Sequence, residues 1–262
     1  MIKKAIQHNL VPIIGISPIS LDNQRKELDI PLEIRTKLGK RCSFKDSNIK
    51  NVFKTIALDI AHFKVPYLCL ATEINFLALG NLKEFLRFVK LYKNIYKEVK
   101  KISQKTRIFV SFQWDVQYLI DTKELEKVKE HSKIFEIFKP QLDFIALTSY
   151  PINFFRNPID IPRDYYISID KHIDHSDKVL FLEIGCPTRG LGSEESQVAF
   201  VKRLPILLRN LNLIGIDWAL LHDVNIPEFD EDLRSLGLFT DDGKEKLGFE
   251  SFNNLKKYDH SY

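Results

Sequence analysis

Short apolar runs that alternate with helical stretches constrain the fold of this chain most strongly. In each run, apolar residues follow one another without the alternation of a half-exposed strand, which is typical of strands buried on both faces of a parallel sheet. Parallel strands joined by helices form right-handed βαβ units. The expected strands are 10–17, 66–71, 107–112, 142–147, 179–183 and 214–221. Their spacing of roughly 35 residues predicts an α/β fold of the (β/α)8 TIM-barrel type.

Amphipathic periodicity predicts helices between these strands. The expected helices are 48–63, 82–102, 122–138, 164–172 and 193–209, with one more after Gly243. The polar stretch 18–47 contains two prolines and many charges, so we expect an elaborated loop there. Because single α/β barrels commonly reach this length, residues 1–262 are expected to form one domain.

Composition narrows the function classes. The chain has 39 basic and 35 acidic residues, and a formal net charge of +4 is too small to indicate a nucleic-acid partner. No apolar run approaches the roughly 20 residues that span a bilayer, so no membrane partner is expected. The N-terminal segment lacks the cleavage site of a signal peptide, and the compartment is left open. The three cysteines lack metal-ligand spacing and no nucleotide-binding glycine motif occurs, so neither a metal nor another cofactor is expected.

Two glutamates stand where expected strands end. Four apolar residues, 179–182, lead directly into Glu183, and the strand 66–71 is followed by Glu73. A carboxylate at such a place costs several kcal/mol to desolvate unless it is paired or used. Active sites of TIM barrels are built at the carboxyl ends of the strands, and two facing carboxylates suit glycoside hydrolysis. The pattern therefore predicts a two-glutamate catalytic site.

Several short motifs support a more specific interpretation. They are TEIN at 72–75, SYP at 149–151, LEIG at 182–185, DWALLHD at 217–223 and GLFTDDGKEK at 237–246. In order and spacing they resemble clan GH-A, the TIM-barrel retaining glycoside hydrolases, and among its members the arabinogalactan endo-galactanase-like and mannanase-like enzymes. The resemblance covers the chain from Leu10 to the C-terminus. It implies carbohydrate metabolism, with degradation of a β-linked poly- or oligosaccharide by double displacement.

The resemblance also implies roles for single residues. In this clan the acid/base glutamate closes strand four and the nucleophile closes strand seven, which implies Glu73 and Glu183, respectively. Tyr150 would orient the nucleophile, and Trp218 would be the aromatic platform under the sugar. The substrate-binding candidates are Thr72, Asn75, Trp114, Tyr150, Trp218 and His222. Thr72 departs from the clan, which usually has Asn before the acid/base.

The same resemblance implies an incomplete barrel. If Glu73 closes strand four, then 10–17 is strand three, and the first one or two βα units have no counterpart. An open barrel exposes two sheet edges. We therefore expect a missing segment or a partner chain to complete it, beside the carbohydrate substrate.

Other interpretations stay open at this point. Either glutamate could cap a helix or pair with a lysine, and both tryptophans could be core aromatics. The main rival function is a catalytically inactive or carbohydrate-binding homologue of the same barrel. An aldolase or a metal-dependent hydrolase ranks last, because no expected strand ends in a suitable Lys or His/Asp cluster.

Overall fold

A computed structural model describes residues 2–20, 25, 27–31, 33, 35–36, 42–122 and 134–255. The chain divides into two compact units. The first consists of Met1–Gln113 with Lys123–Ala146, and the second of Trp114–Thr122 with Leu147–Tyr262. Glu73 therefore belongs to the first unit and Glu183 to the second.

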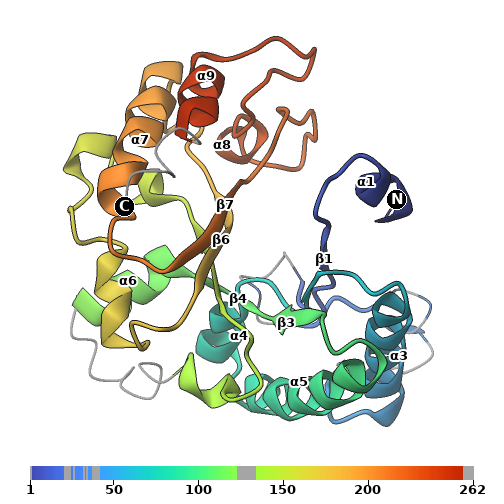
Figure 1. Ribbon diagram of the computed structural model, residues 1–262. Helices are drawn as coiled ribbons and strands as arrows, with labels where there is room; N and C mark the ends of the chain where they lie inside the picture. Colours follow the sequence, from blue (N-terminus) through green and yellow to red (C-terminus); the bar gives the residue numbers. More distant parts are fainter. Residues whose placement is uncertain are drawn as a thin grey trace. The chain divides into compact units, whose positions relative to one another are not determined.

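The first unit is built on a parallel sheet of three strands in the order β1-β2-β3. These strands are β1 (Ile13–Gly15), β2 (Tyr67–Cys69) and β3 (Arg107–Phe109), and β2 pairs with both of the others; Figure 1 labels β1 and β3. Leu68 pairs with Ile14 on one side and with Ile108 on the other. Its side chain is fully buried, as the unbroken apolar run around it predicts.

Helices cover this sheet. Helix α1 (Ile2–Gln7) precedes β1, while α3 (Ser47–His62), α4 (Ile74–Gly80) and α5 (Leu82–Ile102) flank β2 in sequence. Asp46 caps α3 by accepting the backbone N–H of Asn48 at 2.7 Å. Helices α3 and α5 pack through an aromatic cluster in which the Phe53 and Phe88 rings lie 6.2 Å apart. Strand β4 (Ser111–Gln113) and the 3-10 turn η3 (Glu136–Phe138) complete the described elements of this unit.

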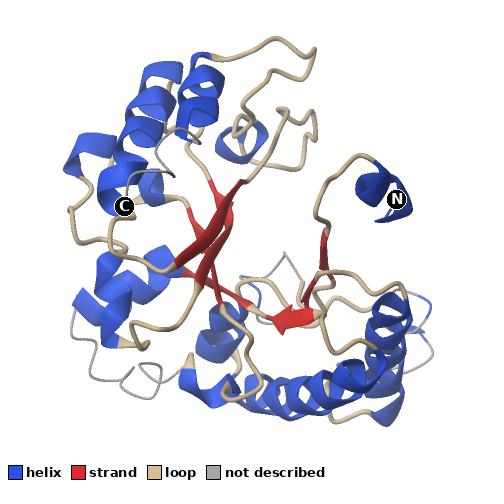
Figure 2. Cartoon of the chain, in the orientation of Figure 1, coloured by secondary structure: helices blue, strands red, loops and turns tan. Residues whose placement is uncertain are grey.

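The second unit contains the parallel pair β6 (Val179–Ile184) and β7 (Leu213–Trp218). Strand β5 (Ile145–Ser149) precedes them and lies next to β6, where the Gly185 N–H donates to the Ser149 carbonyl at 3.3 Å. Figure 2 shows β6 and β7 running side by side. Because parallel strands place their carboxyl ends at one edge, residues that follow β5, β6 and β7 gather there.

Helices of the second unit cover these strands. They are α6 (Trp114–Thr122), α7 (Glu194–Leu207), α8 (Glu231–Arg234) and α9 (Leu247–Asn254), with 3-10 turns η4 (Pro151–Asn153), η5 (Pro158–Asp160) and η6 (Ile167–Lys171). Helices α7 and α9 lie against each other (Figure 1). The Ser193 hydroxyl caps α7 by accepting the N–H of Ser196 at 3.1 Å.

The predicted strands are each found, although 107–112 is divided into β3 and β4. Two helix predictions need correction or fall outside the described residues. Residues 123–133 of the predicted helix 122–138 lie outside the described residues. The region 164–172 holds only the 3-10 turn η6. Helices α4 and α6 were not predicted: α6 begins directly after β4, and residues 70–73 separate the end of β2 from the start of α4. No helix in the described part of the chain is long and apolar enough to cross a membrane.

Candidate active site

Glu183 is the half-buried residue near the end of an otherwise buried strand. The residues of β6 before it are buried, as is Ile184 after it. Tyr150 follows β5 directly, and its hydroxyl donates to Oε2 of Glu183 at 2.7 Å. A phenol donating to a carboxylate stabilises the charged form and fixes its rotamer. The structure therefore brings together two of the residues expected to act together.

A second carboxylate lies beside Glu183. Ile184 pairs with Trp218 across β6 and β7, and Asp217, the residue before Trp218, lies close enough to Glu183 for the two charges to interact. Although Asp217 is exposed as a residue, partial burial of its carboxyl and the neighbouring Glu183 charge raise its pKa from 3.8 to about 6. Asp217 was not among the predicted site residues, although it begins the DWALLHD motif at 217–223.

No basic side chain among the described residues forms an ion pair with Glu183 or Asp217. The simplest structural explanation of a strand-end glutamate, a salt bridge to lysine or arginine, therefore receives no support at Glu183. Tyr150 supplies the hydrogen bond that this carboxylate makes in the described structure. A carboxylate held by one neutral donor keeps its other oxygen for a ligand.

A buried carboxylate lies behind Tyr150. Asp115, on α6, is 0% exposed. Its Oδ2 accepts the backbone N–H of Tyr150 at 2.7 Å, and its Oδ1 accepts the Ser149 hydroxyl at 2.6 Å. The Tyr165 hydroxyl also donates to Oδ1. Nothing in the sequence indicated that Asp115 contacts Tyr150, because the two residues lie far apart along the chain.

Glu73 has different surroundings in the first unit. Its backbone adopts the left-handed region, with φ 49° and ψ 44°, immediately before α4. The Ser111 hydroxyl accepts its backbone N–H at 3.0 Å, and the Arg25 Nε lies 2.8 Å from its Oε2. Arg25 also has positive φ, 57°. Non-glycine residues held in this region cluster at functional sites. A guanidinium at this distance favours the ionised carboxylate.

Two predicted substrate residues flank Glu73. Thr72 is half-buried. Asn75 is 1% exposed, and its amide forms two hydrogen bonds of 2.9 Å with the backbone N–H and carbonyl of Gln113. The paired bonds lock the start of α4 to β4, so Asn75 holds the backbone next to Glu73. This geometry favours a structural role over the predicted sugar contact.

The tryptophans occupy the core. Trp114 is 0% exposed, and its indole N–H donates to the Tyr165 carbonyl at 3.0 Å. Trp218 is 7% exposed; its indole donates to the Leu236 carbonyl at 2.7 Å, and its ring contacts Phe200. Neither ring presents a free face, so the structure favours core roles over the predicted sugar contacts, including the Trp218 platform. A tryptophan at a strand end does not by itself indicate which face of the sheet its ring occupies.

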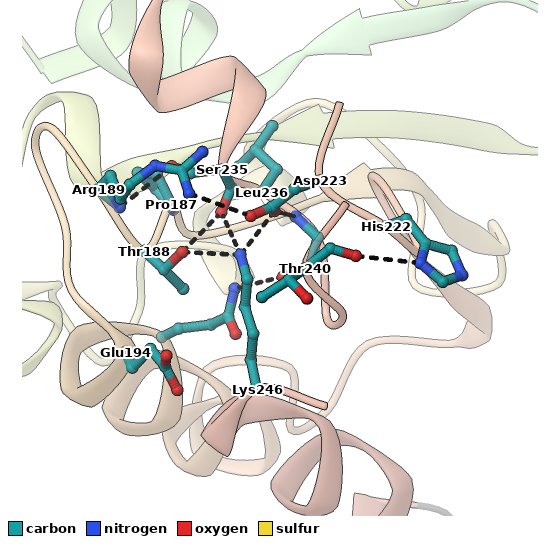
Figure 3. Close-up of polar contacts among 12 residues, drawn as sticks. Pro187, Thr188, Arg189, Glu194, His222, Asp223, Ser235, Leu236, Thr240 and Lys246 are labelled. Atoms are coloured by element: carbon teal, nitrogen blue, oxygen red, sulfur yellow. Dashed lines mark hydrogen bonds and ion pairs between the residues drawn. The ribbon is translucent and has the colours of Figure 1, made fainter. Parts of the chain in front are cut away.

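His222 is exposed, and its Nδ1 lies 3.2 Å from the Thr240 carbonyl. Its neighbour Asp223 belongs to a buried cluster around Lys246 (Figure 3). The Lys246 Nζ lies 2.6 Å from the Asp223 Oδ1 and 2.7 Å from the Thr188 hydroxyl. Desolvation lowers the pKa of Lys246, while its hydrogen bond with Asp223 opposes that change. The cluster joins the loop after β6 to the C-terminal segment, and so supports the region that follows Glu183.

No group of three or more His, Cys, Asp or Glu side chains in the described ranges could hold a metal ion.

Comparisons with known proteins identify the fold. No family model and no curated protein matches the sequence. The GH5_18 glycoside hydrolase from Streptomyces cattleya, solved with GlcNAc, matches 99% of this chain and 65% of its own with a TM-score of 0.74 at 15% identity. The same protein was also solved as a variant with Manb1-4GlcNAc.

Two other solved structures have the same kind of similarity. The β-glucuronidase of an uncultured Clostridium sp. has a TM-score of 0.64 at 13% identity, covering 97% of this chain and 42% of that one. Xylanase 10B from Thermotoga maritima has a TM-score of 0.62 at 11% identity, covering 98% and 78%. This chain thus spans about two thirds of the GH5_18 structure. It has a partial (β/α)8 fold, similar to that of TIM-barrel glycoside hydrolases.

Proposed function

We propose that this chain is a retaining glycoside hydrolase that acts on a β-linked poly- or oligosaccharide. The observation that carries the proposal is the 2.7 Å hydrogen bond from the Tyr150 hydroxyl to Glu183 at the end of β6. The partial (β/α)8 fold adds support, because active sites in this fold lie at the carboxyl ends of the strands. The solved neighbour that holds Manb1-4GlcNAc suggests a β-linked glycan as the first substrate to try.

In the proposed mechanism Glu183 is the nucleophile. Its unbonded oxygen attacks the anomeric carbon while the glycosidic C–O bond breaks, which forms a covalent glycosyl ester. Tyr150 holds the other oxygen, so that the attacking one points at the sugar. Glu73 gives its proton to the departing oxygen, then takes a proton from the water that attacks the ester. The second displacement restores both carboxyl groups and retains the anomeric configuration.

The chemistry needs the two carboxyl groups about 5 Å apart. It also needs a proton on Glu73 in the first step, whereas Arg25 favours its ionised form. We infer that substrate binding displaces or screens Arg25. Thr72 and His222 remain the proposed sugar contacts. A single glycosidase domain over residues 1–262, completed by a missing segment or a partner chain, remains part of the proposal.

The test is hydrolysis of a panel of aryl β-glycosides, including β-mannosides, by the purified chain. We expect turnover with retention of configuration, observed by proton NMR of the first product. Glu183→Ala should abolish turnover, and azide should restore part of it as the inverted glycosyl azide. A folded, monodisperse chain that turns over none of the panel would contradict the proposal.

The rival is a carbohydrate-binding barrel without activity. The Arg25–Glu73 contact favours it, because a binding protein needs no protonated acid. Calorimetric binding of oligosaccharides, unchanged in Glu183→Gln and without any product, would support this rival over hydrolysis.

A further inference from the structure

Asp115 is a buried carboxylate that the proposed reaction does not use. It lies at the second position of α6, fully buried, and its oxygens are held at 2.6–2.7 Å by Ser149 and by the Tyr150 backbone. Burying a charge costs several kcal/mol unless hydrogen bonds replace the water. Two of these hydrogen bonds hold Ser149 and Tyr150, and the Tyr150 hydroxyl donates to Glu183.

The phenols around Asp115 stay protonated and so act as donors or neutral partners. The Tyr165 hydroxyl donates to Oδ1, and the Tyr166 hydroxyl lies 2.9 Å from the Ser149 hydroxyl. Burial, followed by the Asp115 charge, raises the pKa of both phenols well above 10.0. The aromatic rings also pack on one another, with the Tyr165 and Tyr166 centroids 4.9 Å apart. This shell holds the Asp115 carboxylate in one orientation.

We propose that Asp115 is a positioning residue for Glu183 and acts through Tyr150. Its Oδ2 fixes the Tyr150 backbone, and its Oδ1 fixes the preceding Ser149, so the phenol is aimed at the Glu183 carboxylate. The importance of this link for catalysis rests on the proposed function. The link itself is a property of the folded chain and can be measured without a substrate.

Asp115 could act on Glu183 by holding Tyr150 in place or by its negative charge alone. The direction in which the Glu183 pKa changes distinguishes these two possibilities. Loss of the Tyr150 hydrogen bond removes a donor to the charged form of Glu183 and so raises its pKa. Loss of the Asp115 charge alone removes a repulsion and so lowers the Glu183 pKa. Asp115→Asn keeps an oxygen that can accept the Tyr150 N–H, whereas Asp115→Ala keeps none. If Asp115 acts by positioning, Asp115→Ala should therefore raise the Glu183 pKa, whereas Asp115→Asn should not.

The experiment measures the Glu183 pKa by carbon-13 NMR of protein labelled at the glutamate carboxyl carbon, with the signal assigned by Glu183→Gln. Tyr150→Phe should raise this pKa by about one unit. Asp115→Ala should raise it by several tenths of a unit, and Asp115→Asn should lower it or leave it unchanged. In the Tyr150→Phe background, Asp115→Ala should cause no further rise.

If Asp115→Ala does not fold, Tyr165→Phe tests the same proposal. It removes one donor to Asp115 without changing any charge, and should raise the Glu183 pKa only when Tyr150 is present. Asp121→Ala is the matched control, because Asp121 lies on the same helix but bonds His172, 2.6 Å away. It should leave the Glu183 pKa unchanged.

The proposal would be overturned if both Asp115 variants lowered the Glu183 pKa. It would also be overturned if Asp115→Ala still raised that pKa in the Tyr150→Phe background. If Asp115→Ala does not fold, an unchanged pKa in Tyr165→Phe would overturn it as well. None of these pKa measurements requires turnover. Their failure can therefore be distinguished from failure of the proposed function in the activity test.

Discussion

Glu73 follows a buried strand of the first unit and Glu183 lies near the end of a buried strand of the second, yet the surroundings of the two carboxylates differ. Glu73 has a left-handed backbone and a guanidinium 2.8 Å from its carboxylate. Glu183 lies within β6, accepts a hydrogen bond from the neutral Tyr150 and has the acidic Asp217 nearby. Opposed environments are how proteins give two carboxyl groups different tasks. The described contacts, however, favour charge on Glu73, which the resemblance implies is the acid.

The position of a glutamate at a strand end and the charges around it are therefore separate properties, and neither can be inferred from the other. The clan resemblance implies the roles of the two glutamates. The side chains around them determine which one holds a proton before substrate arrives, and the following variants test that division.

Loss of Glu183 is expected to have the largest effect. On a substrate with a good leaving group, Glu183→Ala should lower kcat/KM by roughly 10⁵-fold, because the nucleophile is absent. Glu73→Ala should lower it by less than about tenfold on that substrate, since a good leaving group needs no protonation. Steady-state kinetics with a dinitrophenyl glycoside make the measurement. Equal losses in both variants would break the assigned division of roles.

The buried cluster after β6 gives the next largest effect. Lys246→Met should lower the free energy of unfolding by about 3–5 kcal/mol, because it leaves Asp223 buried without its ammonium partner. Lys101→Met, which breaks an exposed pair with Glu98, is the control and should cost less than about 1 kcal/mol. Urea denaturation measures both. Similar costs would show that the Lys246 cluster does not stabilise this region.

Tyr150→Phe sharpens the Glu183 side of the comparison. Hydrogen bonds to charged groups contribute about 1.5–3 kcal/mol, so we expect a loss of roughly 10- to 100-fold in kcat/KM. Tyr118→Phe provides a tyrosine control on α6 and should retain activity within about twofold. A Tyr150→Phe variant with the wild-type kcat/KM would show that this hydrogen bond does not contribute to catalysis.

Arg25→Met sharpens the Glu73 side. Removing the guanidinium should raise the basic-limb pKa of the activity profile by about one unit, because ionised Glu73 loses its partner. Activity above neutral pH should therefore increase. A pH profile of kcat/KM on a poor leaving group makes the test, and an unmoved basic limb would show that Arg25 does not control the acid.

Asp217→Asn should have the smallest effect. The raised pKa of about 6 means that the folded chain binds more protons than the unfolded chain between about pH 4 and 6. This group's contribution to stability is therefore present at low pH and declines as the pH rises to 6. Asp217→Asn should remove that decline in thermal unfolding curves, and Glu183→Gln should reduce it. A slope that both variants leave intact would show that the two carboxylates do not interact.

Much of the fold followed from the sequence alone. The apolar run before Glu183 determined that this residue ends a buried strand, and the similar runs predicted the other strands of a partial (β/α)8 fold. Period-2 alternation is absent from such runs because both faces are buried, so they identify a strand without identifying its faces. Tertiary structure alone decided that Trp218 turns to the helices and Asp217 to the Glu183 side.

The same limit explains the contacts that sequence reasoning missed. Asp115 meets the Tyr150 N–H across 35 positions and the Tyr165 hydroxyl across 50, and Arg25 reaches Glu73 from a distant loop. Local patterns report hydrophobic periodicity and turn chemistry over a few residues. A hydrogen bond between sequence-distant groups forms only after the strands set their positions, so the sequence determined which residues end the strands, and the fold determined what those residues touch.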